Sequence, residues 1–338
     1  MKNSENTVAV TGASGFIGRR IAWKLAQSGY TVRCLFRREN PPRELSELSA
    51  MGHEVMRTSL EQGDDTEKAL KGCGAVIHAA GKVGDWGSEQ EFRRANAELT
   101  DHLLRWAGSL SIGRFIYISS ISVHGFGHHR NSTENGPYYP LVSAYQRTKL
   151  EAENMVVQNG SDDLQTTVLR PGNVYGPGDR TTFYNMFDAM LQGIMPVIGS
   201  GKKLTCPVYV DDFADSVILA LKNPRCIGEI FNITGGEWVT WRDILYYCAS
   251  LLGIDPIRFP LPPLPAGIAA YVMENSYRLF GIKGEPPLTK YRVDHVTHDF
   301  HFDISKAEEL LSFRPGTDYR TGFKTTIKAF LAENGNFR

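Results

Sequence analysis

The segment TGASGFIG, residues 11–18, decides the fold of this chain. It follows the short apolar stretch TVAV and opens residues 16–28 (FIGRRIAWKLAQS), where apolar side chains recur at helical spacing up to Gly29. Glycines at three-residue intervals permit a tight turn, a close approach of the backbone to a ligand, and close packing of the helix on the strand. A strand, a glycine loop and a helix in this order predict a site for a dinucleotide pyrophosphate at the helix N-terminus. The residues that we expect to hold the cofactor here are Gly12, Ser14, Gly15, Phe16, Ile17 and Gly18.

Outward from this loop, apolar strand patterns alternate with helical ones. Further strands are expected at TVRCLF (31–36), AVIHAA (75–80), RFIYISS (114–120) and TTVLRP (166–171), with helices between them at 91–109 and from near Tyr145. Strands separated by helices of ten or more residues indicate βαβ units and a parallel sheet. The predicted fold class is therefore α/β, a Rossmann doubly wound parallel sheet with helices on both faces.

After Pro171 the pattern changes, because residues 172–207 are rich in Gly, Pro and Thr. A strand and helix return at VYVDDFADSVILALKN (208–223), and EIFNIT (229–234) has the composition of a strand. A mostly apolar helix is expected at about 266–280. We predict an NADP-binding Rossmann domain of residues 1–175 with 206–234. A smaller, discontinuous substrate-binding domain, 176–205 with 235–338, would lie over the carboxyl edge of the sheet.

Composition excludes several classes of protein. The 338 residues carry 37 Lys plus Arg and 37 Asp plus Glu, so the zero net charge argues against a nucleic-acid partner. The 42% of hydrophobic residues excludes disorder over most of the chain. The 5 cysteines form no CxxC pair, so we expect no metal site and a reducing compartment. With no secretory signal and no apolar run of membrane-spanning length, a cytoplasmic location is expected.

The end of the second strand selects the cofactor. An NAD site normally has an acidic residue there for the ribose 2′-hydroxyl, but this strand ends in Phe36, Arg37 and Arg38. Two guanidinium groups suit a 2′-phosphate, which each can hold with two hydrogen bonds. We therefore favour NADP(H) as cofactor and keep NAD as the alternative.

A candidate catalytic group lies at and after the end of the fourth predicted strand. Tyr145 and Lys149 stand four residues apart, one helical turn, and Ser120 ends the strand upstream. A tyrosine acting as a base near pH 7 needs its pKa lowered by about 3 units, roughly 4 kcal/mol. A close lysine cation and an oxidised nicotinamide ring would lower it. Each of these motifs is weak alone, whereas the order of loop, strand-end serine and Tyr/Lys pair is specific.

The sequence resembles the extended branch of the short-chain dehydrogenase/reductase family. The matching segments are in family order and cover about two-thirds of the chain: TGASGFIG (11–18), VIHAAG (76–81), Asn96, YISSISVHG (117–125), YQRTK (145–149), LRPGNVYGPGD (169–179) and VYVDDFADS (208–216). Later segments, FNITGGEWVTWRDIL and HFDISKAEELLSFRP, are most similar to 3β-hydroxysteroid dehydrogenase-like and dihydroflavonol reductase-like members.

The resemblance implies a role for each matching position. Tyr145 would give or take the proton, Lys149 would hold the nicotinamide ribose and lower the tyrosine pKa, and Ser120 would bind the reacting oxygen. Ser122 is a weaker candidate for that last role, and Asn96 would be structural. The family's dimer, formed through helices near 91–109 and 145–160, would make the chain a homodimer. Further cofactor contacts are implied for Ala79, Ala80, Gly81, Pro171, Gly172, Asn173 and Val174.

Three positions depart from the family pattern. His124 stands where many members have Tyr, and Ser59 stands where many have the Asp that contacts adenine, with Asp64 or Asp65 as substitutes. The segment GSGKKLTCPVYVDD lacks the arginine with which nucleotide-sugar enzymes hold a diphosphate, and this weakens a sugar-nucleotide substrate.

Three functional hypotheses follow. The first is an NADP(H)-dependent oxidoreductase that interconverts a secondary alcohol and a ketone. The apolar stretch 257–280 suits a sterol-like, flavonoid-like or acyl small-molecule substrate, and with Arg278 and Lys283 it also suits peripheral contact with a membrane surface. The alternative is a nucleotide-sugar epimerase or dehydratase with tightly held NAD. The third is a cofactor-binding redox sensor without turnover, against which the retained Ser120, Tyr145 and Lys149 argue.

Overall fold

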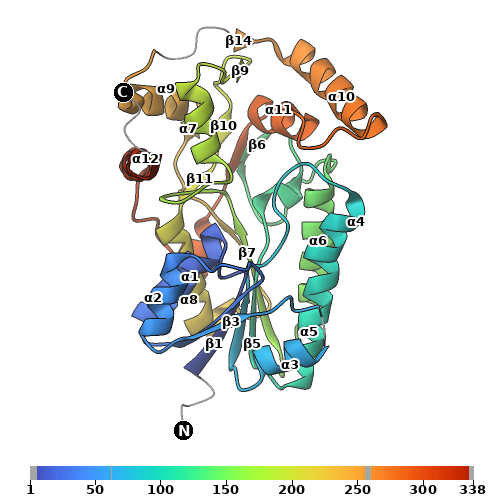
Figure 1. Ribbon diagram of the computed structural model, residues 1–338, viewed down its shortest axis with the longest axis vertical. Coiled ribbons are helices and arrows are strands. Elements are labelled where there is room, and N and C mark those ends of the chain that lie inside the picture. The colour runs from blue at the N-terminus through green and yellow to red at the C-terminus, as the bar shows by residue number, and fades with distance from the viewer. Residues whose placement is uncertain (1–5, 62, 256–259, 335–338) are drawn as a thin grey trace.

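A parallel sheet of seven strands forms the centre of the computed structural model, which describes residues 6–61, 63–255 and 260–334 (Figure 1). Every neighbouring pair in this sheet is parallel, which confirms the predicted fold class. In spatial order the strands are β3 (Glu54–Arg57), β2 (Thr31–Phe36), β1 (Thr7–Thr11), β4 (Ala75–His78), β5 (Arg114–Ile118), β7 (Gln165–Pro171) and β12 (Ile230–Ile233).

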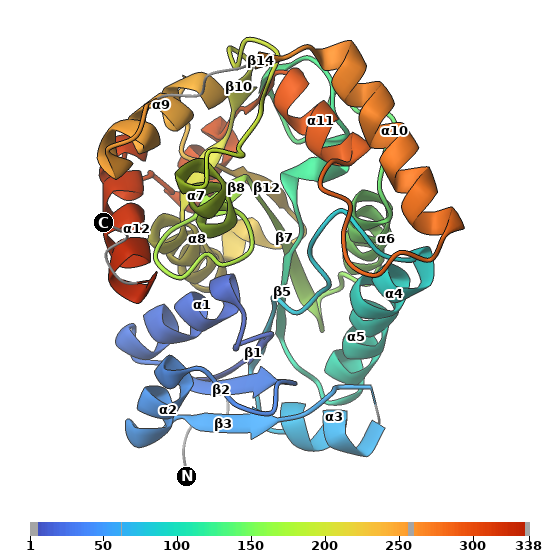
Figure 2. The same ribbon diagram turned by 45° about the horizontal axis from the view of Figure 1, so that its top comes forward.

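Helices cover both faces of the sheet (Figure 2). One face packs against α1 (Phe16–Gln27), α2 (Arg43–Ala50) and α8 (Val210–Lys222). The other packs against α3 (Gly63–Leu70), α5 (Leu99–Ser109) and α6 (Ala144–Gln158). The helix predicted at 91–109 is continuous in direction but contains a π-helical turn, η2 (Arg94–Glu98), between α4 (Glu89–Arg93) and α5.

The strand order reverses between β1 and β4, and ligands of such sheets bind at the carboxyl ends of the strands beside this point. His78, which is fully buried, fastens the two strand ends to the helix layer. Its ring nitrogens lie 2.8 Å from Thr11 Oγ1 and 3.0 Å from Thr100 Oγ1. The edge that would hold the cofactor is thus fixed by a buried hydrogen-bond network.

The C-terminal elements lie over the carboxyl edge of the sheet. A second core, rich in aromatic residues, joins α7 (Phe183–Leu191), α9 (Trp241–Leu252) and α12 (Tyr319–Asn334). The division into two domains at the predicted boundaries stays a prediction. Short strand pairs complete this part: β8 (Asn173–Tyr175) with β11 (Pro207–Tyr209), β10 (Leu204–Thr205) with β13 (Val239–Thr240), β9 (Val197–Ile198) with β14 (Pro260–Leu261), and β6 (His129–Ser132) with β15 (Phe300–Phe302).

Two further helices, α10 (Pro263–Leu279) and α11 (Lys290–Thr297), pack against each other at the outer end of the molecule (Figures 1 and 2). The apolar helix expected at about 266–280 is α10, which begins at Pro263, a residue favoured in the first turn of a helix. Residues 257–259 of the apolar stretch lie outside the described residues. Within the described ranges, no helix has the length and apolar character needed to cross a bilayer.

Candidate active site

The glycine loop leaves no room for side chains at two of its glycines. A Cβ on Gly12, where φ is +68°, would lie 2.8 Å from the Cα of Ala80, and a Cβ on Gly18 would collide with the carbonyl oxygen of Gly12. Gly15 caps α1 without any side-chain hydrogen bond, and the first turn holds no acidic residue. The backbone N–H groups at the start of α1 are therefore available to an anion, so the loop fits a dinucleotide pyrophosphate.

Three arginines gather where β2 and β3 end. Arg37 and Arg38 are exposed, while Phe36 is buried. Arg57, which the sequence analysis missed, pairs in register with Phe36, and its Nε donates to the Arg37 carbonyl at 3.4 Å. Its position at the end of the next strand is the signal that could have found it. Among the described residues, none of the three arginines forms an ion pair with a carboxylate.

The contacts of Ser59, Asp64 and Asp65, the candidates for binding adenine, are those of ordinary turn and helix residues. Ser59 is half-buried, and its hydroxyl accepts from the backbone N–H of Glu61 at 3.4 Å. Asp64 and Asp65 are exposed in the first turn of α3, where negative charge favours the helix. All three retain an ordinary structural explanation.

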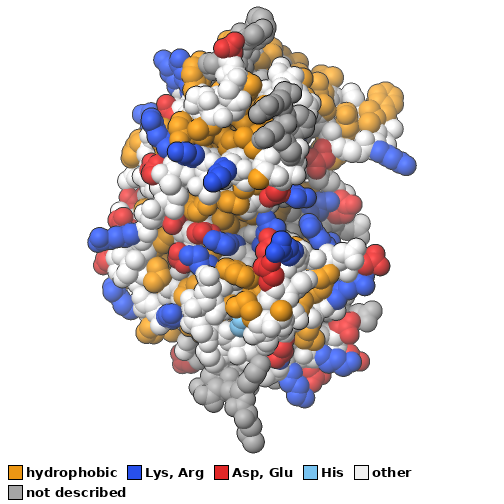
Figure 3. All heavy atoms as spheres, turned by 60° about the vertical axis from the view of Figure 1, so that its left-hand side comes forward, with side chains coloured by type: hydrophobic (Ala, Val, Ile, Leu, Met, Phe, Trp, Pro, Cys, Tyr) orange, Lys and Arg blue, Asp and Glu red, His pale blue; other side chains and the backbone are white. Residues whose placement is uncertain are grey.

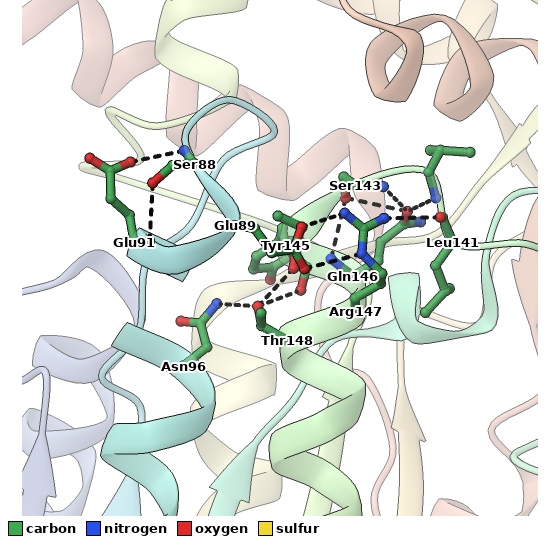
Figure 4. Close-up of polar contacts among 12 residues, drawn as sticks. Ser88, Glu89, Glu91, Asn96, Leu141, Ser143, Tyr145, Gln146, Arg147 and Thr148 are labelled. Atoms are coloured by element: carbon green, nitrogen blue, oxygen red, sulfur yellow. Dashed lines mark hydrogen bonds and ion pairs between the residues drawn. The ribbon is translucent and has the colours of Figure 1, made fainter. Parts of the chain in front are cut away.

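The first turn of α6 fixes the position of Tyr145 (Figure 4). Ser143 caps the helix by accepting from the backbone N–H of Gln146, whose side chain accepts in return from the Ser143 N–H. Arg147 points away and pairs with Glu89 of α4. Because α6 begins at Ala144, the predicted Tyr/Lys pair lies within its first two turns and on one side.

Two neighbouring serines at the end of β5 point to opposite sides, as residues of an extended chain do. Ser119 is buried and donates to the Glu153 carboxylate at 2.6 Å, so its role is structural. The Ser120 hydroxyl lies close enough to the Tyr145 phenol to lower its pKa. It also lies 2.9 Å from the Ser122 hydroxyl and accepts from the Ser122 N–H at 3.2 Å. The structure thus places the two serine candidates side by side.

Lys149 is buried one helical turn after Tyr145, beside Gly81. Its Nζ donates to the carbonyl of Ile118 at 2.6 Å and lies 4.5 Å from the centre of the Tyr117 ring. Burial lowers the pKa of Lys149 to about 7, although the Glu153 carboxylate acts in the opposite direction. Near neutral pH this lysine can therefore gain or lose a proton.

Burial raises the pKa of the Tyr145 phenol above its ordinary value, and the hydrogen bond with Ser120 offsets this only in part. This direction is opposite to the lowering that the sequence argument requires of a general base. The physical reason is that removal from water disfavours the phenolate. The protonated phenol is the dominant form, which suits a residue that gives its proton away.

The predicted structural role of Asn96 agrees with its contacts. Its Oδ1 accepts from the Lys82 N–H at 2.7 Å, and its Nδ2 donates to the Thr148 hydroxyl at 3.1 Å (Figure 4). A Cβ on Gly81 would lie 2.8 Å from the same Oδ1, which explains the glycine. Asn96 thereby ties the η2 turn to α6 and to the segment that follows β4.

The other predicted cofactor residues lie at the same carboxyl edge. Ala79, Ala80 and Gly81 directly follow β4, Pro171 ends β7, and Gly172 lies between β7 and β8. At the start of β8, Asn173 donates to the Thr205 hydroxyl at 2.8 Å, and Val174 is half-buried beside it.

His124, which stands where many family members have Tyr, is a residue of the core. It is buried, and its ring stacks on Tyr138 with a centroid separation of 4.7 Å. Its Nε2 lies 2.9 Å from the Arg170 guanidinium. Burial, followed by the nearby arginine, lowers the pKa of His124 to about 3, so the ring is neutral near pH 7.

Tyr291 of α11 completes the site, and the sequence analysis missed it. The Ser122 hydroxyl lies near enough to the Tyr291 phenol to lower its pKa, and Tyr145 and Asp85 act on the same phenol electrostatically. The ring packs edge-on against Phe126 at 4.8 Å. No local motif marks this tyrosine, because it lies 169 residues after Ser122 in the chain and reaches the site only through the fold.

Asp85 joins the loop after β4 to α11. Its carboxylate accepts from the Thr289 hydroxyl and, at 3.0 Å, from the Arg292 guanidinium. Two segments far apart in sequence are thereby held together beside the catalytic candidates, and this fixes the helix that carries Tyr291.

Comparison with known proteins agrees with this geometry. The profile of the NAD dependent epimerase/dehydratase family matches residues 8–234, from β1 through β12. The chain belongs to this family. It is an enzyme of the extended short-chain dehydrogenase/reductase type, which uses NAD(P) and acts on CH–OH groups.

The 2-alkyl-3-oxoalkanoate reductase of Shewanella oneidensis is 27% identical over 95% of this chain and 85% of its own. The decarboxylating sterol-4-alpha-carboxylate 3-dehydrogenase of Dictyostelium discoideum is 29% identical over 95% and 99%. The UDP-glucose 4-epimerase of Vibrio cholerae is 26% identical over 97% and 96%. The crystal structure of gox2253 superposes with a TM-score of 0.82, at 26% identity over 98% and 100% of the two chains. The similar proteins thus include both dehydrogenases or reductases and an epimerase.

Proposed function

We propose that this protein is an NADP(H)-dependent oxidoreductase that interconverts a ketone and a secondary alcohol on a hydrophobic substrate. The observation that carries the proposal is the placement of Tyr145 and the buried Lys149 one helical turn apart on α6, with the Ser120 hydroxyl near enough to the phenol to lower its pKa. The serine and tyrosine hydroxyls would each donate a hydrogen bond to the reacting oxygen.

The residues of the chain would divide the work as follows. Ser120 orients the reacting oxygen, and Tyr145 donates its proton to that oxygen during reduction or accepts it during oxidation. NADPH supplies the hydride when bound, and NADP+ accepts it in the reverse direction. Lys149, one helical turn from Tyr145, stabilises the phenolate that remains after proton transfer and is placed to hold the ribose of the cofactor.

The names of two relatives suggest a substrate class. A 2-alkyl-3-oxoalkanoate and a sterol-4-alpha-carboxylate acted on at C3 both carry a carboxylate on the carbon next to the reacting carbon. We extend this chemistry to the present chain, as an α-substituted β-oxo or β-hydroxy acid with a large apolar part. The aromatic rings of Phe126, Tyr291 and His295, which lie 4.8–6.0 Å from one another, supply an apolar wall beside Ser122.

The cofactor proposal rests on Arg37, Arg38 and Arg57, whose guanidinium groups are exposed without ion-paired carboxylates in the described residues. They suit the 2′-phosphate of NADP better than the two ribose hydroxyls of NAD. We also propose a cytoplasmic homodimer formed through α5 and α6, which size-exclusion chromatography with light scattering tests directly.

The experiment that tests the reaction is a substrate panel followed through the absorbance of NADPH. It comprises β-oxo acids with a 2-alkyl chain, 3-oxosteroids, flavonoid ketones and UDP-glucose. We expect consumption of one NADPH for each β-oxo acid reduced, at a rate that Tyr145→Phe lowers by about 10²–10⁴-fold. Conversion of the UDP-sugar without net change in nicotinamide would instead establish the second candidate, an epimerase with bound NAD, which similarity to UDP-glucose 4-epimerase keeps open.

A further inference from the structure

The large apolar residues of helix α10 face solvent, whereas those of a core helix face the interior of the protein. The side chains that face the body of the protein are small: Ala266 and Ala270 are fully buried against α11. Leu264 and Leu279, by contrast, are 76% and 79% exposed. The larger set of exposed apolar residues in this segment is Leu264, Ile268, Tyr271, Val272, Leu279, Phe280 and Ile282.

The exposed residues form a continuous stripe. At 100° per residue, positions 264, 268, 271, 272, 275, 278 and 279 fall within an arc of about 120°. The helix ends there, and Phe280 and Ile282 extend the stripe beyond it. In Figure 3 hydrophobic side chains gather on the projection at the upper right, at the height of α10 in Figure 1, with basic side chains at its tip. We call residues 264–283 the α10 surface.

The charges of the α10 surface are of one sign on its outer side. Arg278 and Lys283 are exposed, and the Arg278 guanidinium lies 5.3 Å from the centre of the Trp86 ring. The one acidic residue of the segment, Glu274, turns toward α11, where its carboxylate accepts from the Lys290 N–H at 2.9 Å. An apolar stripe flanked by cations, with no outward carboxylate, complements a lipid surface that carries negative headgroups.

We propose that the α10 surface binds to the surface of an anionic lipid bilayer. The helix would lie in the plane of the interface, with its apolar stripe among the acyl chains and Arg278 and Lys283 at the headgroups. One-sided apolar character over 17 residues suits this orientation and not a span. Because α10 packs on α11, which carries Tyr291, the proposed contact would place the active-site side of the molecule next to the membrane.

Flotation of the purified full-length protein with lipid vesicles tests this proposal. We expect it to float with vesicles of phosphatidylcholine and phosphatidylglycerol, less with phosphatidylcholine alone, and less in high salt. The double variant Ile268→Ser with Leu279→Ser should reduce binding by about tenfold or more. Arg278→Glu with Lys283→Glu should abolish the preference for anionic vesicles. The matched control, Met51→Ser, removes an exposed apolar side chain at α2 and should bind as the wild type does.

NADPH binding and the thermal unfolding midpoint show that each variant is folded, independently of any reductase activity. Absence of vesicle binding by the wild type, or equal binding by the serine variants, would overturn the proposal. Loss of dimerisation by those variants, without vesicle binding by the wild type, would show that a second copy of the chain covers the α10 surface instead.

Discussion

Tyr291 of α11 and Ser122, which follows β5, lie close enough across the boundary between the C-terminal helices and the sheet for the serine hydroxyl to lower the pKa of the phenol. Ser122 in turn lies 2.9 Å from Ser120, and Ser120 acts in the same way on Tyr145. Four hydroxyl groups from three parts of the chain therefore form one connected row. The position of the serine that would hold the reacting oxygen depends on a tyrosine from α11.

Removal of the Tyr291 hydroxyl should disturb this row while preserving the fold. We expect Tyr291→Phe to lower kcat by about tenfold, the effect of one hydrogen bond of roughly 1.4 kcal/mol, with a smaller change in KM. NADPH affinity should not change, and the dependence of kcat on pH should shift. The control is Tyr277→Phe, the same substitution on α10, where the ring only packs against Trp86 at 6.1 Å. Equal kinetics of both variants would remove Tyr291 from the site.

Tyr145→Phe tests the acid directly. Because Tyr145 is the phenol that lies one helical turn from Lys149 and near Ser120, we expect its loss to lower kcat by about 10²–10⁴-fold. Cofactor affinity, measured by quenching of NADPH fluorescence, should stay within a few-fold. A variant that keeps its turnover would show that another group transfers the proton.

The three arginines at the ends of β2 and β3 should set the preference between NADPH and NADH. Arg37→Ala and Arg57→Ala should each weaken NADPH binding by about tenfold, since each removes one charge-assisted contact of roughly 1.5 kcal/mol, and should leave NADH binding nearly unchanged. Arg43→Ala serves as the control, because its exposed side chain pairs with Glu47 on α2. Isothermal titration with the two cofactors gives the ratio. Equal affinity of the wild type for NADPH and NADH would end the NADP proposal.

The buried ion pair below the site should be important for stability. Glu153 accepts from Arg170 and from Ser119, and both charged side chains are 2% exposed. We expect Glu153→Gln to reduce the free energy of unfolding by about 3 kcal/mol, because the arginine is left buried without its counter-charge. Glu151→Gln, two residues earlier on α6 in a partly exposed pair with Arg93, should cost less than about 1 kcal/mol. Urea denaturation gives the free energy of unfolding of both variants. A similar decrease in the two would contradict this account.

Acid should destabilise the protein through His78. Burial, with a smaller contribution from the Lys149 charge, lowers the pKa of this histidine to about 3, against about 6.5 in an unfolded chain. Between these two pKa values the unfolded state binds more protons than the folded state, so the free energy of unfolding rises with pH. The stabilisation by the neutral ring is fully present above the pKa of the unfolded chain. Between about pH 6.5 and pH 5 His78 alone should contribute a loss of about 2 kcal/mol. His78→Asn should show a correspondingly weaker dependence in urea denaturation, and an unchanged slope would refute this origin.

The sequence by itself determined the parallel sheet, the glycine loop and the placement of Tyr145 and Lys149 on one side of a helix. These features depend on short-range relationships: the period of apolar residues, the conformational freedom of glycine, and a four-residue spacing. Ser120 could be placed for the same reason, because the carboxyl end of a parallel strand faces the crevice.

Only the tertiary structure decided the partners of those residues. Arg57 joins Arg37 because β3 pairs with β2, and Tyr291 reaches Ser122 because Asp85 binds α11 to the loop after β4. The direction of the Tyr145 pKa, and the outward position of the large apolar residues of α10, likewise depend on which groups the folded chain removes from water. Burial is a property of contacts between distant segments, and no local pattern in a sequence encodes it.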